Sequence, residues 1–132
     1  DKSKPFYDSS EVKDFDGVEN EYPIFFCYML INSLFSNNVN EAKIYYESIK
    51  GLLVDMNDSK VLPHYYYVPK DLIDYERMEV GSQTRVPSPE IEENATHLWT
   101  QSIWFICQML GFYLFLKIFF IFKSINLIIY IY

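Results

Sequence analysis

The sequence is poor in the residues that metal and phosphate sites commonly use. It contains two cysteines, two histidines and four glycines in 132 residues. Cys27 and Cys107 each fall in an apolar helical stretch, where a lone thiol behaves as a small hydrophobic side chain, and their spacing suggests neither a metal site nor a disulfide framework. There is no glycine-rich phosphate loop, no cysteine or histidine cluster and no nucleophile elbow. We therefore expect no metal, no cofactor and a reducing, cytoplasmic compartment.

Basic residues are also scarce. Lysine and arginine number 11 against 18 aspartates and glutamates, which gives a net charge of -7. Two of the basic residues, Lys117 and Lys123, lie in the apolar C-terminal stretch, so residues 1–110 are more acidic still. An acidic surface repels a phosphate backbone, and nucleic acid is therefore a poor partner for this chain.

The chain is organised around an apolar helix that is predicted between Glu19 and Phe35. Pro23 suits the first turn of a helix, because its ring fixes φ and its missing N–H is not needed there. From Ile24 to Leu34 apolar residues fill almost every position, so no polar stripe is left to face water. The run is shorter than the roughly 20 residues that span a bilayer. We expect this helix to be buried on all sides, and the chain, which begins without Met, to be a fragment of a larger protein.

A second, amphipathic helix is predicted after Asn37. Asn38 and Glu41 have the spacing of a capping box. Apolar residues then recur at helical spacing on one face, namely Tyr45, Ile49, Leu52 and Leu53. An all-apolar helix followed through a short turn by an amphipathic one is typical of the inner and outer layers of a two-layered helical body. We expect the two helices to form an antiparallel hairpin.

Between Asp55 and Thr96 the helical period disappears, and prolines and glycines mark turns and loops. A connection of this length is usually functional or disordered, although a short helix fits between Pro69 and Glu79. The helical pattern returns from Thr96 and ends at Gly111. Its apolar stripe consists of Trp99, Ile103, Ile106 and Leu110. The predicted fold class is therefore all-α, with a long irregular loop region between helices.

Residues 111–132 differ sharply in composition from the rest, because they are almost wholly apolar, with Lys117, Lys123 and Asn126 as interruptions. By length and hydropathy the stretch passes as a membrane span. It also fits a core helix, or a non-native read-through made of residues with AT-rich codons. The abrupt change at Gly111 favours the read-through interpretation. We expect residues 1–110 to form part of a helical domain and residues 111–132 to be an apolar tail.

Few side chains qualify as candidate site residues. His64 and His97 have no partners at metal-ligand spacing, and His97, close to a predicted helix start, suits a capping or packing role. Tyr65 and the two tyrosines that follow it can stack on the apolar faces of sugars, or pack half-buried with their hydroxyls in water. Ser88 precedes a proline in a polar loop and is a candidate phosphorylation site, although such dipeptides are often only turns.

Four blocks of the sequence carry a family resemblance. They are YDSSEVKDFDGVENEYPIFFCYMLI, LPHYYYVPKDLIDYE, GSQTRVPS and HLWTQSIWFI, in this order. Together they resemble the large regulatory subunits of phosphorylase b kinase, and the YYYVP and GSQ-x-R elements resemble the beta type rather than the alpha type. The resemblance runs from Lys4 to Leu110 and does not extend past Gly111, which supports the read-through interpretation of the tail.

The resemblance implies a partial (α/α)6 toroid of the glucoamylase-like type, in which the first two predicted helices are an inner and outer pair. In the related hydrolases a general-base glutamate follows a Leu-Pro-like step. Here His64 follows Leu62 and Pro63, and an imidazole suits the activation of water less well than a carboxylate does. We therefore expect hydrolysis to be lost and the site to keep at most a glycan groove around His64, Tyr65 and Trp99.

The resemblance also implies a non-catalytic regulatory and scaffolding subunit, which controls the phosphorylation of glycogen phosphorylase in glycogen metabolism. Its partners would be the catalytic kinase subunit, calmodulin and the other large regulatory subunit, in an inhibited assembly released by calcium and by phosphorylation. Calmodulin binding and prenylation are implied without residues of this chain, and prenylation implies attachment to the cytoplasmic side of the plasma membrane. A glucoamylase-like hydrolase and a small membrane protein anchored by residues 112–132 are the alternatives.

Overall fold

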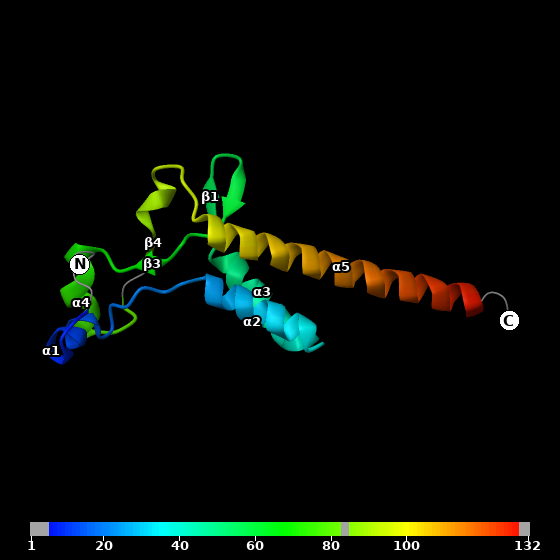
Figure 1. Cartoon of the computed structure of the whole chain (residues 1–132), viewed down its shortest axis with the longest axis horizontal. Helices are drawn as coiled ribbons and strands as arrows, with labels where there is room; N and C mark the ends of the chain where they lie inside the picture. The colour runs from blue at the N-terminus through cyan, green and yellow to red at the C-terminus, as the bar shows by residue number, and fades with distance from the viewer. Residues whose placement is uncertain (1–5, 83–84, 130–132) are drawn as a thin grey trace.

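The computed structural model of this chain describes residues 6–82 and 85–129, with side chains up to Tyr113. Most of these residues are helical, and the strands are short (Figure 1). The α-helices are α1 (Ser9–Val12), α2 (Ile24–Phe35), α3 (Val39–Gly51), α4 (Ile73–Met78) and α5 (Leu98–Ile129). Short 3-10 helices are η1 (Lys13–Phe15), η2 (Lys70–Leu72) and η3 (Pro89–Ile91). The strands are β1 (Val54–Met56), β2 (Ser59–Val61), β3 (Tyr66–Tyr67) and β4 (Val86–Pro87).

Helices α2 and α3 form the predicted antiparallel hairpin (Figure 1). Asn37 adopts a left-handed conformation with φ of 56°, which ends α2. The side-chain oxygen of Asn38 then caps α3 by accepting the backbone N–H of Glu41 at 3.3 Å. The carboxylate of Glu41 accepts from the side-chain amide of Asn38 at 2.9 Å, rather than from its backbone N–H. The predicted cap is therefore confirmed, although the hydrogen bond from Asn38 back to the Glu41 carboxylate comes from the side-chain amide.

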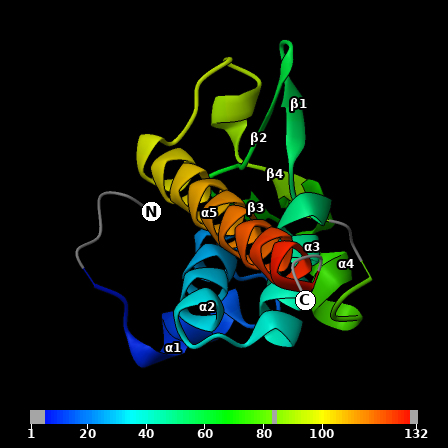
Figure 2. The same ribbon diagram turned by 90° about the vertical axis from the view of Figure 1, so that its right-hand side faces the viewer.

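The core lies where α2, α3 and α5 meet. Helix α5 lies beside α2 in both views of the ribbon (Figures 1 and 2). The buried cluster consists of Cys27, Leu30, Ala42, Ile49, Leu62, Trp104 and Cys107. Burial of these side chains is the main favourable contribution to folding of the segment. Leu62 is the member that follows β2, so the core also fixes the start of the LPHYYYVP segment.

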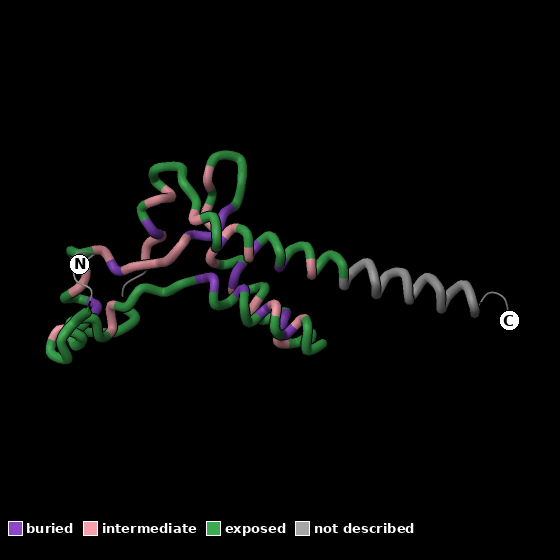
Figure 3. The backbone as a smooth tube through the Cα atoms, viewed as in Figure 1, coloured by how far each residue is buried: buried purple, intermediate pink, exposed green. Residues whose placement is uncertain are grey.

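The prediction that α2 is buried on all sides is wrong within this chain. Its buried residues follow one another at every third position, as Ile24, Cys27, Leu30 and Ser33. The opposite face is open (Figure 3), where Phe25 is 62% exposed and Phe35 is 77% exposed. The reason is that α3 and α5 are the helices that pack on α2, and they cover one side of it. An apolar sequence shows which side chains avoid water but not whether the same chain covers them.

The segment between α3 and α5 is more regular than predicted. Strands β1 and β2 form a hairpin whose turn contains Asn57 in a left-handed conformation. Strand β3 pairs with β4, with Tyr66 opposite Pro87 and Tyr67 opposite Val86. Tyr66 also forms an antiparallel bridge to Glu21. The β3–β4 pairing and the bridge to Glu21 join residues far apart in sequence, which a local pattern does not reveal. The predicted short helix after Pro69 is confirmed as η2 and α4.

The predicted end of the last helix at Gly111 is wrong, because α5 continues to Ile129. A glycine within a helix is tolerated when the residues on both sides favour the helix, and nothing in the structure crowds the position of Gly111. Among the residues whose side chains are described, no helix is long and apolar enough to cross a membrane. The side chains of residues 114–129, and residues 130–132 altogether, lie outside the described part, so the interpretations of the tail stay predictions.

Candidate aromatic site

A glutamine on α5 holds the LPHYYYVP segment in place. The backbone N–H of Leu62 donates to Oε1 of Gln101 at 3.4 Å, and Nε2 of Gln101 donates to the carbonyl oxygen of Leu62. One side-chain amide thus satisfies both backbone groups of a buried residue. The hydroxyl of Tyr66 donates to the carbonyl oxygen of Leu52 at 2.7 Å and anchors the other end of the segment on the end of α3. His64 and Tyr65 lie between these two anchors.

Backbone hydrogen bonds bring two further segments to the same place. Glu21 and Tyr66 exchange N–H to carbonyl bonds of 2.9 and 2.7 Å. The N–H of Ser88 donates to the carbonyl oxygen of Tyr65 at 2.8 Å, immediately before η3. The approach to α2, the LPHYYYVP segment and η3 therefore converge around His64 and Tyr65.

The two histidines of the chain stack on each other. The ring centroids of His64 and His97 are 3.7 Å apart, with 12° between the ring planes. Nδ1 of His97 lies 2.8 Å from the hydroxyl of the buried Thr100 and accepts the N–H of Thr100 at 3.4 Å. The predicted capping and packing role of His97 at the start of α5 is therefore confirmed. Nδ1 of His64 lies 3.8 Å from Oε1 of Glu90 on η3.

The charges of this cluster influence one another. Burial lowers the pKa of His97, the charge of His64 lowers it further, and Glu90 opposes both effects. The pKa of Glu90 is lowered mainly by a hydrogen bond from its own backbone N–H, and His64 contributes to the lowering. Burial raises the pKa of Tyr65, and the nearby carboxylate of Glu90 adds to the rise. The carboxylate is therefore ionised at neutral pH, and it faces a neutral His97 and Tyr65.

A row of aromatic rings leads from this cluster to Trp99. The ring of Tyr22 lies 5.8 Å from the rings of both His64 and Tyr65. The row continues through Phe25 and Tyr28, each 6.3 Å from the ring before it, and ends where Nε1 of Trp99 donates to the hydroxyl of Tyr28 at 2.9 Å. We call these rings the aromatic row. Its members are Tyr22, Phe25, Tyr28, His64, Tyr65 and Trp99.

The aromatic row joins the three residues of the predicted glycan groove through residues that the sequence analysis did not select. His64 and Tyr65 are adjacent, with centroids 5.1 Å apart, whereas Trp99 lies at the far end of the row. Of the intervening rings, Tyr22 lies just before α2, and Phe25 and Tyr28 lie in its first turns, where the sequence pattern indicated core. The signal that they form one surface is their spacing of three residues, which places them on one side of a helix. Trp99 and Phe25 are 60% and 62% exposed, so the row is open to solvent.

A small pocket lies beside Tyr65. It has a volume of about 410 Å³ and is lined by Asn20, Tyr65, Tyr67, Lys70 and Pro89. The rings of Tyr65 and Tyr67 lie 6.1 Å apart on its wall. Within residues 6–82 and 85–113, no three side chains of His, Cys, Asp or Glu gather as metal ligands would. The arrangement offers aromatic faces with a few hydrogen-bonding groups at their edge.

The candidate phosphorylation site Ser88 lies inside this region and is 1% exposed. A protein kinase needs an accessible hydroxyl, so phosphorylation of Ser88 would require this segment to open, and the assignment stays a prediction. Gly81 and Arg85, two residues of the GSQ-x-R element that precedes Ser88, take part in a charge network. The N–H of Gly81 donates to the buried carboxylate of Glu76 at 2.6 Å, and Arg85 lies 3.7 Å from Glu76 and 3.4 Å from Glu21. Gly81 and Arg85 therefore have a structural role, since they hold the carboxylate of Glu76 in place.

Comparison with known proteins identifies the family. No family model matches the chain. However, the skeletal muscle alpha regulatory subunit of phosphorylase b kinase from Mus musculus is 30% identical over 112 residues, which cover 84% of this chain and 9% of that protein. A probable alpha regulatory subunit from Caenorhabditis elegans is 33% identical over 113 residues, which cover 83% of this chain and 9% of that protein. This chain is a homologue of the phosphorylase b kinase regulatory subunits.

A regulatory subunit of the beta type is also similar to this chain. The probable phosphorylase b kinase regulatory subunit beta of Drosophila melanogaster is 34% identical over 111 residues, which cover 83% of this chain and 9% of that protein. The family predicted from the four sequence blocks is therefore confirmed, and the names of its members agree with a regulatory rather than a catalytic subunit. Alpha and beta types both occur among the relatives, so the beta assignment stays a prediction. The chain spans about 9% of the length of these relatives.

Proposed function

We propose that this chain is a segment of a non-catalytic regulatory subunit of a phosphorylase kinase complex, which controls the phosphorylation of glycogen phosphorylase in glycogen metabolism. The observation that carries the proposal is sequence identity of 30 to 34% to such subunits over more than four-fifths of the chain. The alternatives, a glucoamylase-like hydrolase and a small membrane-anchored protein, receive no support from these relatives.

The segment belongs, in this proposal, to a partial (α/α)6 toroid of the glucoamylase-like type formed by residues 1–110. The α2–α3 hairpin, with α5 beside it, supports this reading because it supplies one apolar helix and one amphipathic helix in antiparallel order. The open apolar face of α2 supports it too. Phe25, Met29 and Phe35 are exposed there, and further helices of the longer subunit would cover them.

The site of the ancestral hydrolase is, in this proposal, retained as a surface that binds glycans without cleaving them. His64 stands where the resemblance implies a general-base glutamate, and an inverting hydrolase needs two carboxylates on opposite sides of the sugar. Glu90 is a carboxylate near His64, but its partner there is the imidazole, at 3.8 Å. The aromatic row supplies ring faces of the kind that sugars stack on, and the pocket beside Tyr65 adds a few hydrogen-bonding groups.

The partners proposed from the family are the catalytic kinase subunit, calmodulin and the other large regulatory subunit. The complete protein would restrain the kinase until calcium or phosphorylation releases it. Prenylation, with attachment to the cytoplasmic side of the plasma membrane, is proposed for the complete protein on the same basis.

The test is to precipitate the complete native protein with an antibody against the β1–β2 hairpin, whose tip is exposed. The precipitate is then assayed for phosphorylation of glycogen phosphorylase with calcium and with a calcium chelator. We expect a co-precipitated kinase subunit and activity that requires calcium. A precipitate without kinase activity would refute the proposal, and release of glucose from maltodextrins would replace it with the hydrolase alternative.

A further inference from the structure

The two cysteines of the chain lie against each other in the core, although 80 residues separate them in the sequence. Cys27 is on α2 and Cys107 is on α5, and both are free thiols. Sγ of Cys107 donates a hydrogen bond to the carbonyl oxygen of Cys27 at 3.5 Å. Both side chains belong to the same buried cluster, so the packing of α5 on α2 fixes their distance.

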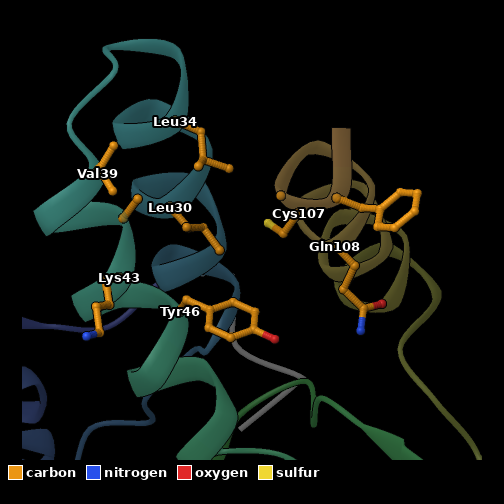
Figure 4. A pocket seen from close by; sticks show the side chains of 10 residues that line it. Leu30, Leu34, Val39, Lys43, Tyr46, Cys107 and Gln108 are labelled. Carbon is orange, nitrogen blue, oxygen red and sulfur yellow. The ribbon is translucent and has the colours of Figure 1, made fainter. Parts of the chain in front are cut away.

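A groove gives small molecules access to one of these thiols. The groove has a volume of about 610 Å³ and runs between α5 and the α2–α3 hairpin. Its walls include Leu30, Leu34, Tyr46, Cys107 and Gln108 (Figure 4). Figure 4 shows the sulfur of Cys107 pointing from α5 toward Leu30 on α2. Cys27 does not line the groove.

The two thiols also differ in acidity. A hydrogen bond to Cys107, together with burial, raises the pKa of Cys27. The same interaction lowers the pKa of Cys107, because the thiol of Cys27 stabilises its thiolate. Since the thiolate is the reactive form, the more acidic thiol is the one that lines the groove.

We propose that Cys27 and Cys107 form a redox modification site, in which a small peroxide converts the thiol pair to a disulfide that links α2 to α5. In the first step the thiolate of Cys107 attacks one peroxide oxygen. An S–O bond forms, the O–O bond breaks, and the leaving hydroxide takes up a proton to become water. In the second step the sulfur of Cys27 attacks the sulfenic acid of Cys107. The S–S bond forms, the S–O bond breaks, and the hydroxide leaves with the proton of Cys27 as water.

In total, two thiols and one hydrogen peroxide give one disulfide and two waters. The thiols are oxidised and the peroxide is reduced, so no further co-reactant is needed. The disulfide would fix α5 on α2 and with it the contact between Trp99 and Tyr28, which are on the same two helices. The oxidation state of the core would thereby control how rigidly the two ends of the aromatic row are held.

The test uses the whole chain, which has no other cysteine, so that any disulfide within one chain joins these two residues. The reduced chain is treated with hydrogen peroxide in buffer and in guanidinium chloride. Free thiols are titrated over time, and the mass of the product is measured without reductant. We expect loss of two hydrogen atoms within a single chain, at least ~10-fold faster in buffer, because the fold holds the sulfurs together. Equal rates in the two solvents, disulfides only between chains, or unchanged thiols would each overturn the proposal.

Single substitutions test the order of attack. In Cys27→Ser the sulfenic acid of Cys107 has no resolving thiol, so we expect a dimedone-type reagent to trap it. In Cys107→Ser we expect slow thiol loss and little trapping at Cys27. Preferential trapping at Cys27 would overturn the assignment of Cys107 as the attacking residue. The comparison in denaturant uses the unaltered chain, so the proposal stays testable even where a variant does not fold.

Discussion

Replacement of Gln101 by alanine should release the LPHYYYVP segment from α5. The Gln101 amide is the hydrogen-bonding partner of both the N–H and the carbonyl of Leu62, a residue that is 0% exposed. Removing the amide takes away the hydrogen-bonding partner that it provides to the N–H and the carbonyl of Leu62. An unsatisfied buried group costs roughly 1–3 kcal/mol, so the two together should lower the free energy of local opening by about 2–6 kcal/mol.

Hydrogen–deuterium exchange of a peptide that covers residues 62–67 measures this opening. The expected loss corresponds to exchange about 30- to 20,000-fold faster than in the unaltered chain, since about 1.4 kcal/mol is a factor of ten. Gln108→Ala is the matched control, because it removes the same amide from an exposed position on the same helix. Equal exchange of residues 62–67 in the two variants would refute the reasoning that Gln101 positions His64 and Tyr65.

Two further predictions concern the stacked histidines and the aromatic row. The pKa of His97 is lowered by burial and by His64 and raised by Glu90, so NMR titration should find it higher in His64→Gln and lower in Glu90→Gln. In the unaltered chain the pKa of His97 is lower in the folded than in the unfolded state, so the unfolded state is protonated first as the pH falls. The folded segment should therefore lose stability below about pH 6.5, and a flat profile of stability against pH would contradict this. Trp99→Ala should weaken binding of maltooligosaccharides by roughly 1–2 kcal/mol in NMR or calorimetric titrations. Phe35→Ala, which lies outside the aromatic row, is the control and should leave binding unchanged. Equal effects of the two substitutions would count against the glycan surface.

Local signals in the sequence predicted the helical framework well. The capping pattern at Asn38 and the break at Asn37 gave the α2–α3 turn, and the residues that carry it are the ones that cap and end the helices. The predicted role of His97 at the start of α5 is confirmed for the same reason, since a cap depends on neighbours within three residues. The end of α5 was misjudged, because a single glycine does not stop a helix whose flanking residues favour it.

Non-local features could not be predicted. The pairing of Tyr66 with Glu21 and with Pro87 depends on segments that meet only in the folded chain. The proximity of Glu90 to His64 has the same origin, and so does the contact between the two cysteines. The apolar residues of α2 predicted burial, but the sequence of one segment does not contain the surface that would cover Phe25 and its neighbours. Phe25 and Tyr28 were missed as members of the aromatic row because they lie in the run that was interpreted as core.

The central proposal is that the complete protein restrains a phosphorylase kinase until calcium releases it. The most direct test is to inactivate the gene that encodes this chain and to compare phosphorylation of glycogen phosphorylase in cell extracts with calcium and with a chelator. The account predicts that the ratio of the two rates falls towards one when the protein is lost, and that it recovers when the gene is restored. An unchanged ratio in extracts that lack the protein would contradict the claim.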